Sequence, residues 1–437
     1  MSTYREDDAA LSALVEDQRV HRDLYISEEL FGLEQERLFA RTWQYVGHAS
    51  EVPDTGDYRT LTLAGRPLIM LRQADGQVAV FYNRCAHKGA QLLTDEYGNA
   101  GRFIRCPYHA LTYKLDGAPL GLPLKAGYEG TCLGQCESGQ GLGHVAAVHT
   151  YRDFVFVRLA EAGPSFDEYF GAAVRSLDDL ADRSPEGKLV ATGGVLRNLI
   201  HCNWKMYLEN INDTVHPVST HESAANAAHA VWHDRPADAV RPMAIEQIQP
   251  FGNSYEFFDQ MGGRVYPNGH SVLGTKFSIH SGYAALQDYE QSLRDHLGEA
   301  RAEEVLHRSP QNAILFPGLA LKSSPQTIRV VRPLAVDLTL IEAWSFRAVG
   351  APDVLLERSM QYNRLAFSPM SIVAHDDVHL FEGLQRGLHS DGNPWISLHR
   401  GWTPDEASGG IRDVNGTNEI LMRNQFRAWA HWMKGVL

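Results

Sequence analysis

Four side chains that can bind metal ions occur as two closely spaced pairs. Cys85 and His87 are separated by one residue, and Cys106 and His109 by two, with eighteen residues between the pairs. Thiolates and imidazoles bind zinc and iron–sulfur clusters. Because each pair supplies one Cys and one His, one iron of a [2Fe–2S] cluster could take both sulfurs and the other iron both imidazoles. A single structural zinc ion with the same four ligands is the alternative.

A second group of possible ligands lies further along the chain. His216 and His221 are five residues apart. A step of five residues turns a regular helix by about 140° beyond one full turn, so both rings can face one metal only if the helix is broken or bulged. Pro217 is a possible cause of such a break. Asp213 precedes His216 by three residues, so its carboxylate could be a fourth ligand, a surface charge or a hydrogen-bonding bridge.

Both groups of residues resemble motifs of the Rieske non-haem iron oxygenases, specifically the large (α) subunits of aromatic-ring-hydroxylating dioxygenases. The matching segments are Cys-Ala-His-Lys-Gly from Cys85, Cys-Pro-Tyr-His from Cys106, Tyr-Lys-Leu-Asp-Gly from Tyr113, and the downstream run that begins Asp376-Asp377. Three positions within the two cysteine–histidine motifs depart from the family pattern. Lys88 stands where Arg is common, and Ala110-Leu111 where Gly-Trp is common.

The resemblance implies a role for each of these residues. Cys85, His87, Cys106 and His109 would bind one [2Fe–2S] Rieske cluster. The other group, His216, His221 and Asp377, would bind one mononuclear Fe(II). Two histidines and one carboxylate leave coordination positions open for oxygen.

The choice of carboxylate depends on spacing within the resemblance. Asp377 lies five residues before Glu382 and ten after Phe367, the spacings that the family shows, and Asp376 is the alternative ligand. Without the two histidines, this acidic pair would be interpreted as the solvated N-terminus of a helix.

The resemblance also implies a reaction and partners. The chain would be a terminal oxygenase that uses O2 and electrons from NAD(P)H through a separate reductase, with or without a ferredoxin, to hydroxylate an aromatic substrate, with cis-dihydroxylation favoured. No G-x-G-x-x-G follows a strand, which argues against a nicotinamide or flavin site in this chain. A Rieske monooxygenase or O/N-demethylase is the first alternative. The second is a non-enzymatic zinc-binding or electron-carrier protein.

The resemblance further implies a head-to-tail homotrimer, possibly with a small β subunit (α3β3). In such a trimer Asp213 would join an iron-ligand histidine to His109 of the next subunit and so serve catalysis.

The substrate pocket is less well defined by sequence. Asn210, Phe316 and Phe367 are the candidate lining residues, together with the apolar stretch after His221 that holds Ala224, Ala225, Ala227, Ala228, Val231 and Trp232. Any of these apolar residues could equally belong to the core. The Arg and Lys positions do not single out a carboxylate clamp, so benzoate-like and uncharged arenes both remain possible.

The surrounding pattern predicts two domains and an N-terminal segment. Residues 1–45 look helical, with Ser27 as an N-cap, and should pack on the catalytic domain. Residues 46–160 contain short alternating runs at 58–63, 67–71, 78–82 and 153–159, as expected for a small all-β domain. Residues 161–437 read as α+β, an antiparallel sheet covered by helices, and the resemblance implies a helix-grip (START-like) arrangement.

Individual elements of the larger domain can also be predicted. Strand patterns occupy 189–199, 312–316, 327–331 and 338–346, and helical patterns occupy 165–182, 202–230, 377–388 and 417–434.

Composition excludes several classes of protein. The chain has 437 residues, 44% of them hydrophobic, and a net charge of −13, with no basic stripe to neutralise phosphates, which argues against nucleic acid. No apolar run reaches membrane-spanning length, and the first residues show no n-region and h-region pair, so neither a membrane span nor a secretion signal is expected. Five cysteines suit a reducing cytoplasm, and Cys132 and Cys136, without a nearby His, are expected to be small buried residues.

Overall fold

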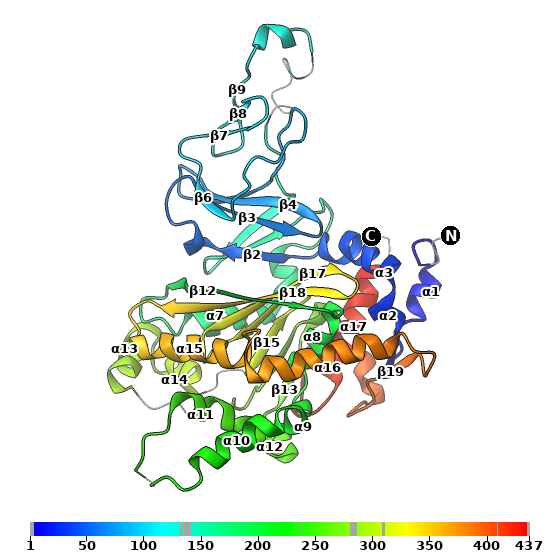
Figure 1. The fold of residues 1–437 in the computed structure, drawn as a ribbon, viewed down its shortest axis with the longest axis vertical. Helices are drawn as coiled ribbons and strands as arrows, with labels where there is room; N and C mark the ends of the chain where they lie inside the picture. Colours follow the sequence, from blue (N-terminus) through cyan, green and yellow to red (C-terminus); the bar gives the residue numbers. More distant parts are fainter. Residues whose placement is uncertain are drawn as a thin grey trace. The chain divides into compact units, whose positions relative to one another are not determined.

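The chain divides into two compact units. Residues Met1–Leu38 and Ser165–Leu437 form the larger unit, and Phe39–Pro164 form the smaller unit (Figure 1). The computed structural model describes residues 4–131, 133, 141–236, 238–279, 286–307, 311–408 and 410–434. Cys132 and Cys136 lie outside the described residues.

The smaller unit is built from short antiparallel strands, as predicted. One sheet has the order β5-β4-β3-β6, a second β7-β8-β9 and a third β10-β11-β2. The strands are β2 (Gln44–His48), β3 (Asp57–Leu63), β4 (Arg66–Arg72), β5 (Val78–Tyr82), β6 (Tyr97–Asn99), β7 (Ile104–Arg105), β8 (Thr112–Tyr113), β9 (Pro119–Gly121), β10 (Ala147–Tyr151) and β11 (Phe154–Arg158). Alternating apolar residues of these strands, such as Val46, Leu68 and Val155, form its core.

The larger unit contains an antiparallel sheet with the order β12-β18-β17-β16-β15-β14-β13-β20. Its strands are β12 (Leu189–Ile200), β13 (Gly263–Val265), β14 (Ser271–Leu273), β15 (Asn312–Leu315), β16 (Leu319–Lys322), β17 (Thr327–Ala335), β18 (Leu338–Ala348) and β20 (Arg412–Val414). A separate pair joins β1 (Arg19–His21) to β19 (Trp395–Ser397).

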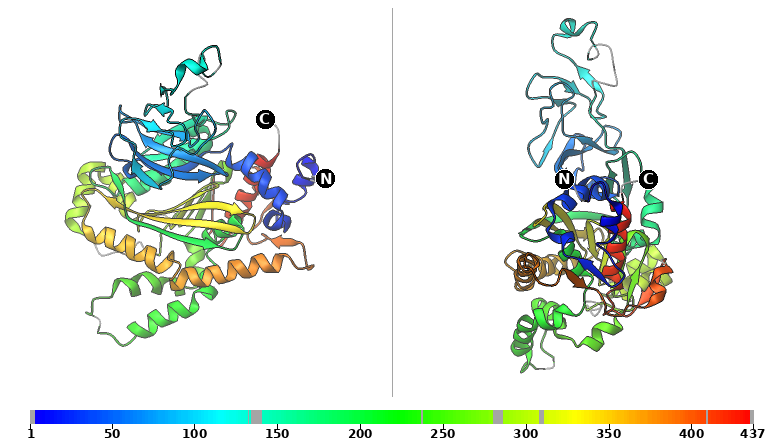
Figure 2. Two further views of the ribbon diagram at one scale, coloured as in Figure 1. Left: turned by 45° about the horizontal axis from the view of Figure 1, so that its top comes forward. Right: turned by 90° about the vertical axis from the view of Figure 1, so that its right-hand side faces the viewer.

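Helices cover this sheet. The two long helices α15 (Asp353–Ala366) and α16 (Ile372–Leu388) follow one another along the sheet beside β12 and β18 (Figures 1 and 2), and α17 (Ile420–Met433) contacts β13 and β14. The remaining α-helices are α1 (Asp8–Ser12), α2 (Asp23–Ile26), α3 (Glu28–Leu33), α6 (Phe166–Phe170), α7 (Arg175–Ala181), α8 (Trp204–Ile211), α9 (His216–Thr220), α10 (Glu222–Trp232), α11 (Met243–Ile248), α12 (Tyr255–Gln260), α13 (Gln287–Leu297) and α14 (Glu299–His307). The α+β prediction is confirmed.

Several elements differ from the sequence prediction. Ser27 caps α3 as expected, its Oγ accepting from the Leu30 N–H, but the N-terminal segment also contributes strand β1. Helix α16 begins at Ile372, five residues earlier than predicted, because the Ser371 side chain caps it by accepting from the Ala374 N–H. Asp377 therefore lies within the helix and not at its N-terminus. Within the described part of the chain, no helix is long and apolar enough to cross a membrane.

Candidate metal centres

The two cysteine–histidine loops of the smaller unit have the same backbone geometry. In each loop the cysteine N–H donates to the carbonyl five residues further on, at 2.8 Å in both, and the cysteine carbonyl accepts from the N–H four residues further on. That fourth residue is Gly89 in the first loop and Ala110 in the second, and both have positive φ, +76° and +59°. The second loop therefore places a side chain where the backbone favours glycine.

The four side chains form a cysteine pair and a histidine pair. The thiols of Cys85 and Cys106 are both buried, and Cys85 contributes to lowering the pKa of Cys106, while the ring centroids of His87 and His109 lie 4.7 Å apart. A single tetrahedral zinc ion, with bonds of about 2.0–2.3 Å, would bring all four ligand atoms within about 4 Å of one another. Among the described residues, no three of these four form a cluster of ligand atoms of the kind that His216, His221 and Asp377 form. Two pairs held apart suit two metal ions better than one.

Neighbouring groups favour this arrangement. The Tyr113 hydroxyl lies 3.1 Å from Cys85 Sγ and accepts from the Ala86 N–H, which fixes its position at the sulfur. Although burial raises it, the pKa of the Cys106 thiol is lowered overall by the backbone N–H groups of His109 and Tyr108. His87 Nδ1 is buried and without a hydrogen-bond partner among the described residues, as expected of a nitrogen reserved for a metal.

The second group lies in the larger unit, where α9 and α16 meet. His216 begins α9 and His221 ends it, with φ −103° and ψ 16°. The predicted interruption of the helix is therefore present, but at His221. Pro217 occupies the first turn of α9, a position that proline tolerates because its missing N–H would have no helical partner there. The interruption lets both imidazoles approach α16.

The two imidazoles converge on one carboxylate. Asp377 Oδ1 lies 3.4 Å from His221 Nε2 and 3.7 Å from His216 Nε2, and the three candidate ligand atoms all lie within 4.8 Å of one another. Asn210 of α8 is also close, with Nδ2 3.1 Å from His216 Nε2 and 3.0 Å from Asp377 Oδ1.

Each histidine has its own second carboxylate on the opposite ring nitrogen. His216 Nδ1 lies 3.3 Å from Asp213 Oδ2, and His221 Nδ1 lies 3.4 Å from Asp376 Oδ2. A proton on each Nδ1 would satisfy these carboxylates and leave both Nε2 lone pairs facing Asp377. Asp213 itself is fixed by the backbone N–H groups of Val215 and His216 and by Arg400.

Burial sets the protonation of this group. It lowers the pKa of His221, so the neutral imidazole that a metal requires is favoured. Burial also raises the pKa of the Asp377 carboxyl, against the attraction of the two histidines. A divalent cation placed between this carboxylate and the two imidazoles would supply the positive charge that favours the ionised carboxylate.

A cavity opens beside the three residues. It is lined on the metal side by Asn210, Asp213, Thr214, His216, His221 and Asp377, and on the apolar side by residues such as Phe251, Phe258, Ile279 and Phe367. Asn312, Lys322 and Arg329 of the sheet also line it, together with Gln311 and with Tyr362 of α15. Of the three candidate pocket residues, Asn210 and Phe367 line it. Phe316 does not, because it is buried against Trp204, with its backbone fixed by Tyr169 and His270.

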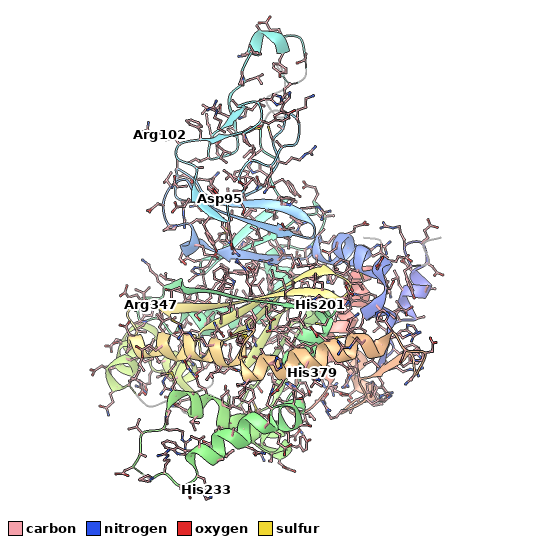
Figure 3. The ribbon with its side chains drawn as sticks, viewed as in Figure 1. Asp95, Arg102, His201, His233, Arg347 and His379 are labelled. Atoms are coloured by element: carbon pink, nitrogen blue, oxygen red, sulfur yellow. The ribbon has the colours of Figure 1, made fainter. Side chains whose placement is uncertain are left out.

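The apolar stretch after His221 also serves mainly as core. Ala224 and Ala228 pack with Ile248 and Tyr362, whereas Val231 is exposed. Three more histidines, His201, His233 and His379, are labelled in Figure 3 and are exposed. The high histidine content is thus only partly explained by the two centres.

Comparison with known proteins agrees with both centres. Residues 42–137 match the family described as the Rieske [2Fe-2S] domain, and residues 167–435 match the ring hydroxylating alpha subunit (catalytic domain). The chain is 30% identical to the anthranilate 1,2-dioxygenase large subunit of Acinetobacter baylyi, covering 94% of this chain and 88% of the relative. It is 26% identical to the N,N-dimethyl phenylurea N-demethylase subunit alpha of a Sphingobium species, covering 94% and 90%.

The fold agrees as well. A solved structure of naphthalene 1,2-dioxygenase with indole bound in the active site superposes with a TM-score of 0.78 at 20% identity, over 99% of this chain and 95% of the other. The architecture and the matched domains define an iron-dependent oxidoreductase with a Rieske domain. The chain belongs to the family of ring-hydroxylating oxygenase alpha subunits, the Rieske-type ring-hydroxylating dioxygenases. The domain implies a [2Fe–2S] cluster and the catalytic family a mononuclear iron.

Proposed function

We propose that this chain is the terminal oxygenase of a multicomponent system that dihydroxylates an aromatic ring. The convergence of His216, His221 and Asp377 beside a cavity with apolar walls carries the proposal. In it these three side chains hold Fe(II), and Cys85, His87, Cys106 and His109 hold the [2Fe–2S] cluster. When bound, the two centres supply one-electron transfer and reductive activation of O2.

The chain's own residues prepare the site for this chemistry. Asp213 and Asp376 hold the Nδ1 protons of the two histidines, which keeps each Nε2 available and fixes both ring planes. Asn210 donates to Asp377 Oδ1 and so orients that carboxylate. The walls formed by Phe251, Phe258 and Phe367 exclude water and accept a flat apolar ring.

Electrons must come from other proteins in this proposal. A separate NAD(P)H reductase, with or without a ferredoxin, would reduce the cluster. We further propose a homotrimer, possibly with a small β subunit, in which Asp213 links an iron-ligand histidine to His109 of the next subunit. Two observations support such a contact. His109 is exposed, and Asp213 lines a surface cavity of about 290 Å³ together with the exposed Leu380 and Leu384.

The proposal is tested by spectroscopy and product analysis together. The purified protein should show the visible absorption and EPR signal of a Rieske cluster, and Cys106→Ser should remove both. With a surrogate reductase, wild-type protein should convert an arene to a cis-dihydrodiol carrying both atoms of ¹⁸O2. His216→Ala should keep the cluster spectrum and lose the product. A colourless wild-type protein would exclude the proposal.

An N- or O-demethylase is the second candidate, because a relative of similar coverage is named as an N-demethylase subunit. Both reactions would use the same proposed ligands. Product analysis separates them, because a demethylase releases formaldehyde and incorporates a single oxygen atom.

A further inference from the structure

Two buried cations face the candidate active site from the sheet. Lys322 of β16 is 2% exposed and Arg329 of β17 is 3% exposed, and both line the cavity that contains Asp377. In the antiparallel register Ala320 pairs with Arg329, and Lys322 is two residues beyond Ala320. Because alternate residues of a strand share one face, Lys322 and Arg329 are diagonal neighbours on the same face.

Within the described part of the chain, no carboxylate pairs with either cation. No Asp or Glu oxygen of the described residues lies within 4.0 Å of Lys322 Nζ or of the Arg329 guanidinium. Residues 280–285 and 308–310, which flank cavity residues Ile279 and Gln311, contain no Asp or Glu in the sequence. The described residues and the two short segments beside the cavity therefore supply no carboxylate counter-ion.

Three other buried cations of this chain are paired with carboxylates. Lys205 Nζ lies 2.5 Å from Glu34, the Arg423 guanidinium 2.6 Å from Glu406, and the Arg59 guanidinium 3.1 Å from Glu51. Burying a charge without a partner costs several kcal/mol, so cations of this kind are normally paired.

The existing contacts stabilise the pair only in part. Lys322 Nζ lies 5.0 Å from the Tyr362 ring centroid, and the Arg329 guanidinium lies 4.5 Å from that of Phe367. Arg329 donates to Asn312 Oδ1 at 2.9 Å, and Arg329 Nε is buried without a partner. Burial, with the neighbouring Arg329, lowers the pKa of Lys322 well below its usual range. An anion placed between the two side chains would reverse that effect.

We propose that Lys322 and Arg329 bind the carboxylate of an aromatic acid and hold its ring toward His216, His221 and Asp377. This inference rests on the proposed function and adds the charge of the substrate. The planar guanidinium fork can meet two carboxylate oxygens, while the lysine ammonium supplies a point charge. The aromatic and aliphatic walls of the same cavity then contact the ring.

The test compares ligands of the same shape and different charge. Benzoate and toluene are titrated into the metal-loaded wild-type protein at pH 7, and their dissociation constants are measured by calorimetry. Benzoate should bind more tightly than toluene. In Lys322→Met and in Arg329→Met, benzoate should bind roughly 10- to 100-fold more weakly, the loss expected for a hydrogen bond to a charged group, while toluene binds equally or better.

Control variants separate recognition from folding. Arg347→Met removes a cation of the same sheet that is paired with Asp353 at the surface, and it should leave the benzoate-to-toluene ratio unchanged (Figure 3). Lys322→Arg should recover most of the affinity for benzoate. Thermal unfolding should show that each variant is folded, which is expected because methionine replaces an unpaired buried cation.

Each outcome has a distinct meaning. Equal affinities of wild-type protein and both methionine variants for benzoate, whether benzoate coordinates the metal or binds elsewhere, would overturn the assignment. If benzenesulfonate bound more tightly than benzoate and its affinity fell in the methionine variants, Lys322 and Arg329 would be an anion site for sulfonates, and the assignment to carboxylates would be wrong. If neutral arenes were dihydroxylated and aromatic acids were not, the proposed function would stand and this inference would fall. If the protein bound benzoate more tightly than toluene but oxygenated no arene, this inference would stand and the proposed function would fall.

Discussion

The adjacent carboxylates of α16 provide a sharp test of the proposed iron site. Asp377 faces the Nε2 atoms of His216 and His221, whereas Asp376 faces only Nδ1 of His221. We therefore expect Asp377→Ala to remove a ligand and Asp376→Ala to remove only an orienting hydrogen bond. Glu382→Gln is the matched control, because Glu382 is on the same helix and its nearest cation, Arg386, is 3.9 Å away.

The size of the second effect follows from the geometry. Loss of a hydrogen-bond partner of a ligating histidine weakens metal binding by about 10- to 100-fold. The Asp376 contact is long, at 3.4 Å, and its side chain is 29% exposed, so water can replace it. We therefore expect a loss near the lower limit, about tenfold. Asp213→Ala should cost more affinity, because its carboxylate also holds two backbone N–H groups near His216 and is 17% exposed.

Anaerobic titration of the proteins with Fe(II) against a competing chelator measures both effects. Wild-type protein and Glu382→Gln should bind about one iron per chain beyond the cluster. Asp376→Ala should bind the same amount with lower affinity, and Asp377→Ala should bind almost none, while the cluster absorption is unchanged in all. An Asp377→Ala protein that loads fully, beside an Asp376→Ala protein that does not, would refute the assignment.

Three further predictions concern stability. Glu209 is half-buried, and its partial burial raises its carboxyl pKa to about 7, against 4.5 in the unfolded chain. The folded chain keeps this proton to higher pH than the unfolded chain does, so the free energy of unfolding should fall by up to about 3 kcal/mol as pH rises from about 4.5 to about 7. Denaturant unfolding of Glu209→Gln over the same pH range should show a smaller fall. Lys205→Met removes the ammonium partner of the buried Glu34 carboxylate, whose remaining donors among the described residues are the Trp204 and Trp429 N–H groups. The variant should cost about 3–5 kcal/mol in denaturant unfolding, and a neutral result would mean that the ion pair is dispensable. Ala110→Gly should raise stability by at most about 1 kcal/mol, because glycine relieves the strain of the positive φ but also increases the conformational entropy of the unfolded chain. Ala79→Gly in β5, where φ is not positive, should lower stability, and thermal unfolding compares the two variants.

Local patterns of sequence predicted the smaller unit well. Its strands alternate between apolar and polar residues, and its cysteine and histidine motifs are short and specific. The same approach missed β13, β14 and β20, because a strand of three residues is too short to show a period. It also placed the start of α16 at the acidic pair, since the cap at Ser371 precedes an apolar run that does not look like a helix start.

The pocket could not be predicted in the same way. Lys322 ends the otherwise apolar run Leu-Ala-Leu-Lys, and Arg329 alternates with Ile328 and Val330, so each position had a local sign of burial. Their adjacency depends on the register between β16 and β17, which the sequence does not display. Phe316 shows the opposite error, because a large aromatic residue near a site is as readily core as lining.

The matched geometry of the two cysteine–histidine loops has a consequence for the stability of the smaller unit. Each loop is closed by its own backbone hydrogen bonds, and the strands that flank the loops are paired with neighbouring strands through their backbones. In a zinc finger, by contrast, metal binding provides the free energy of folding. Here the backbone hydrogen bonds of the loops and strands also contribute to folding, so we expect the smaller unit to depend less on its metal for stability than a zinc finger does.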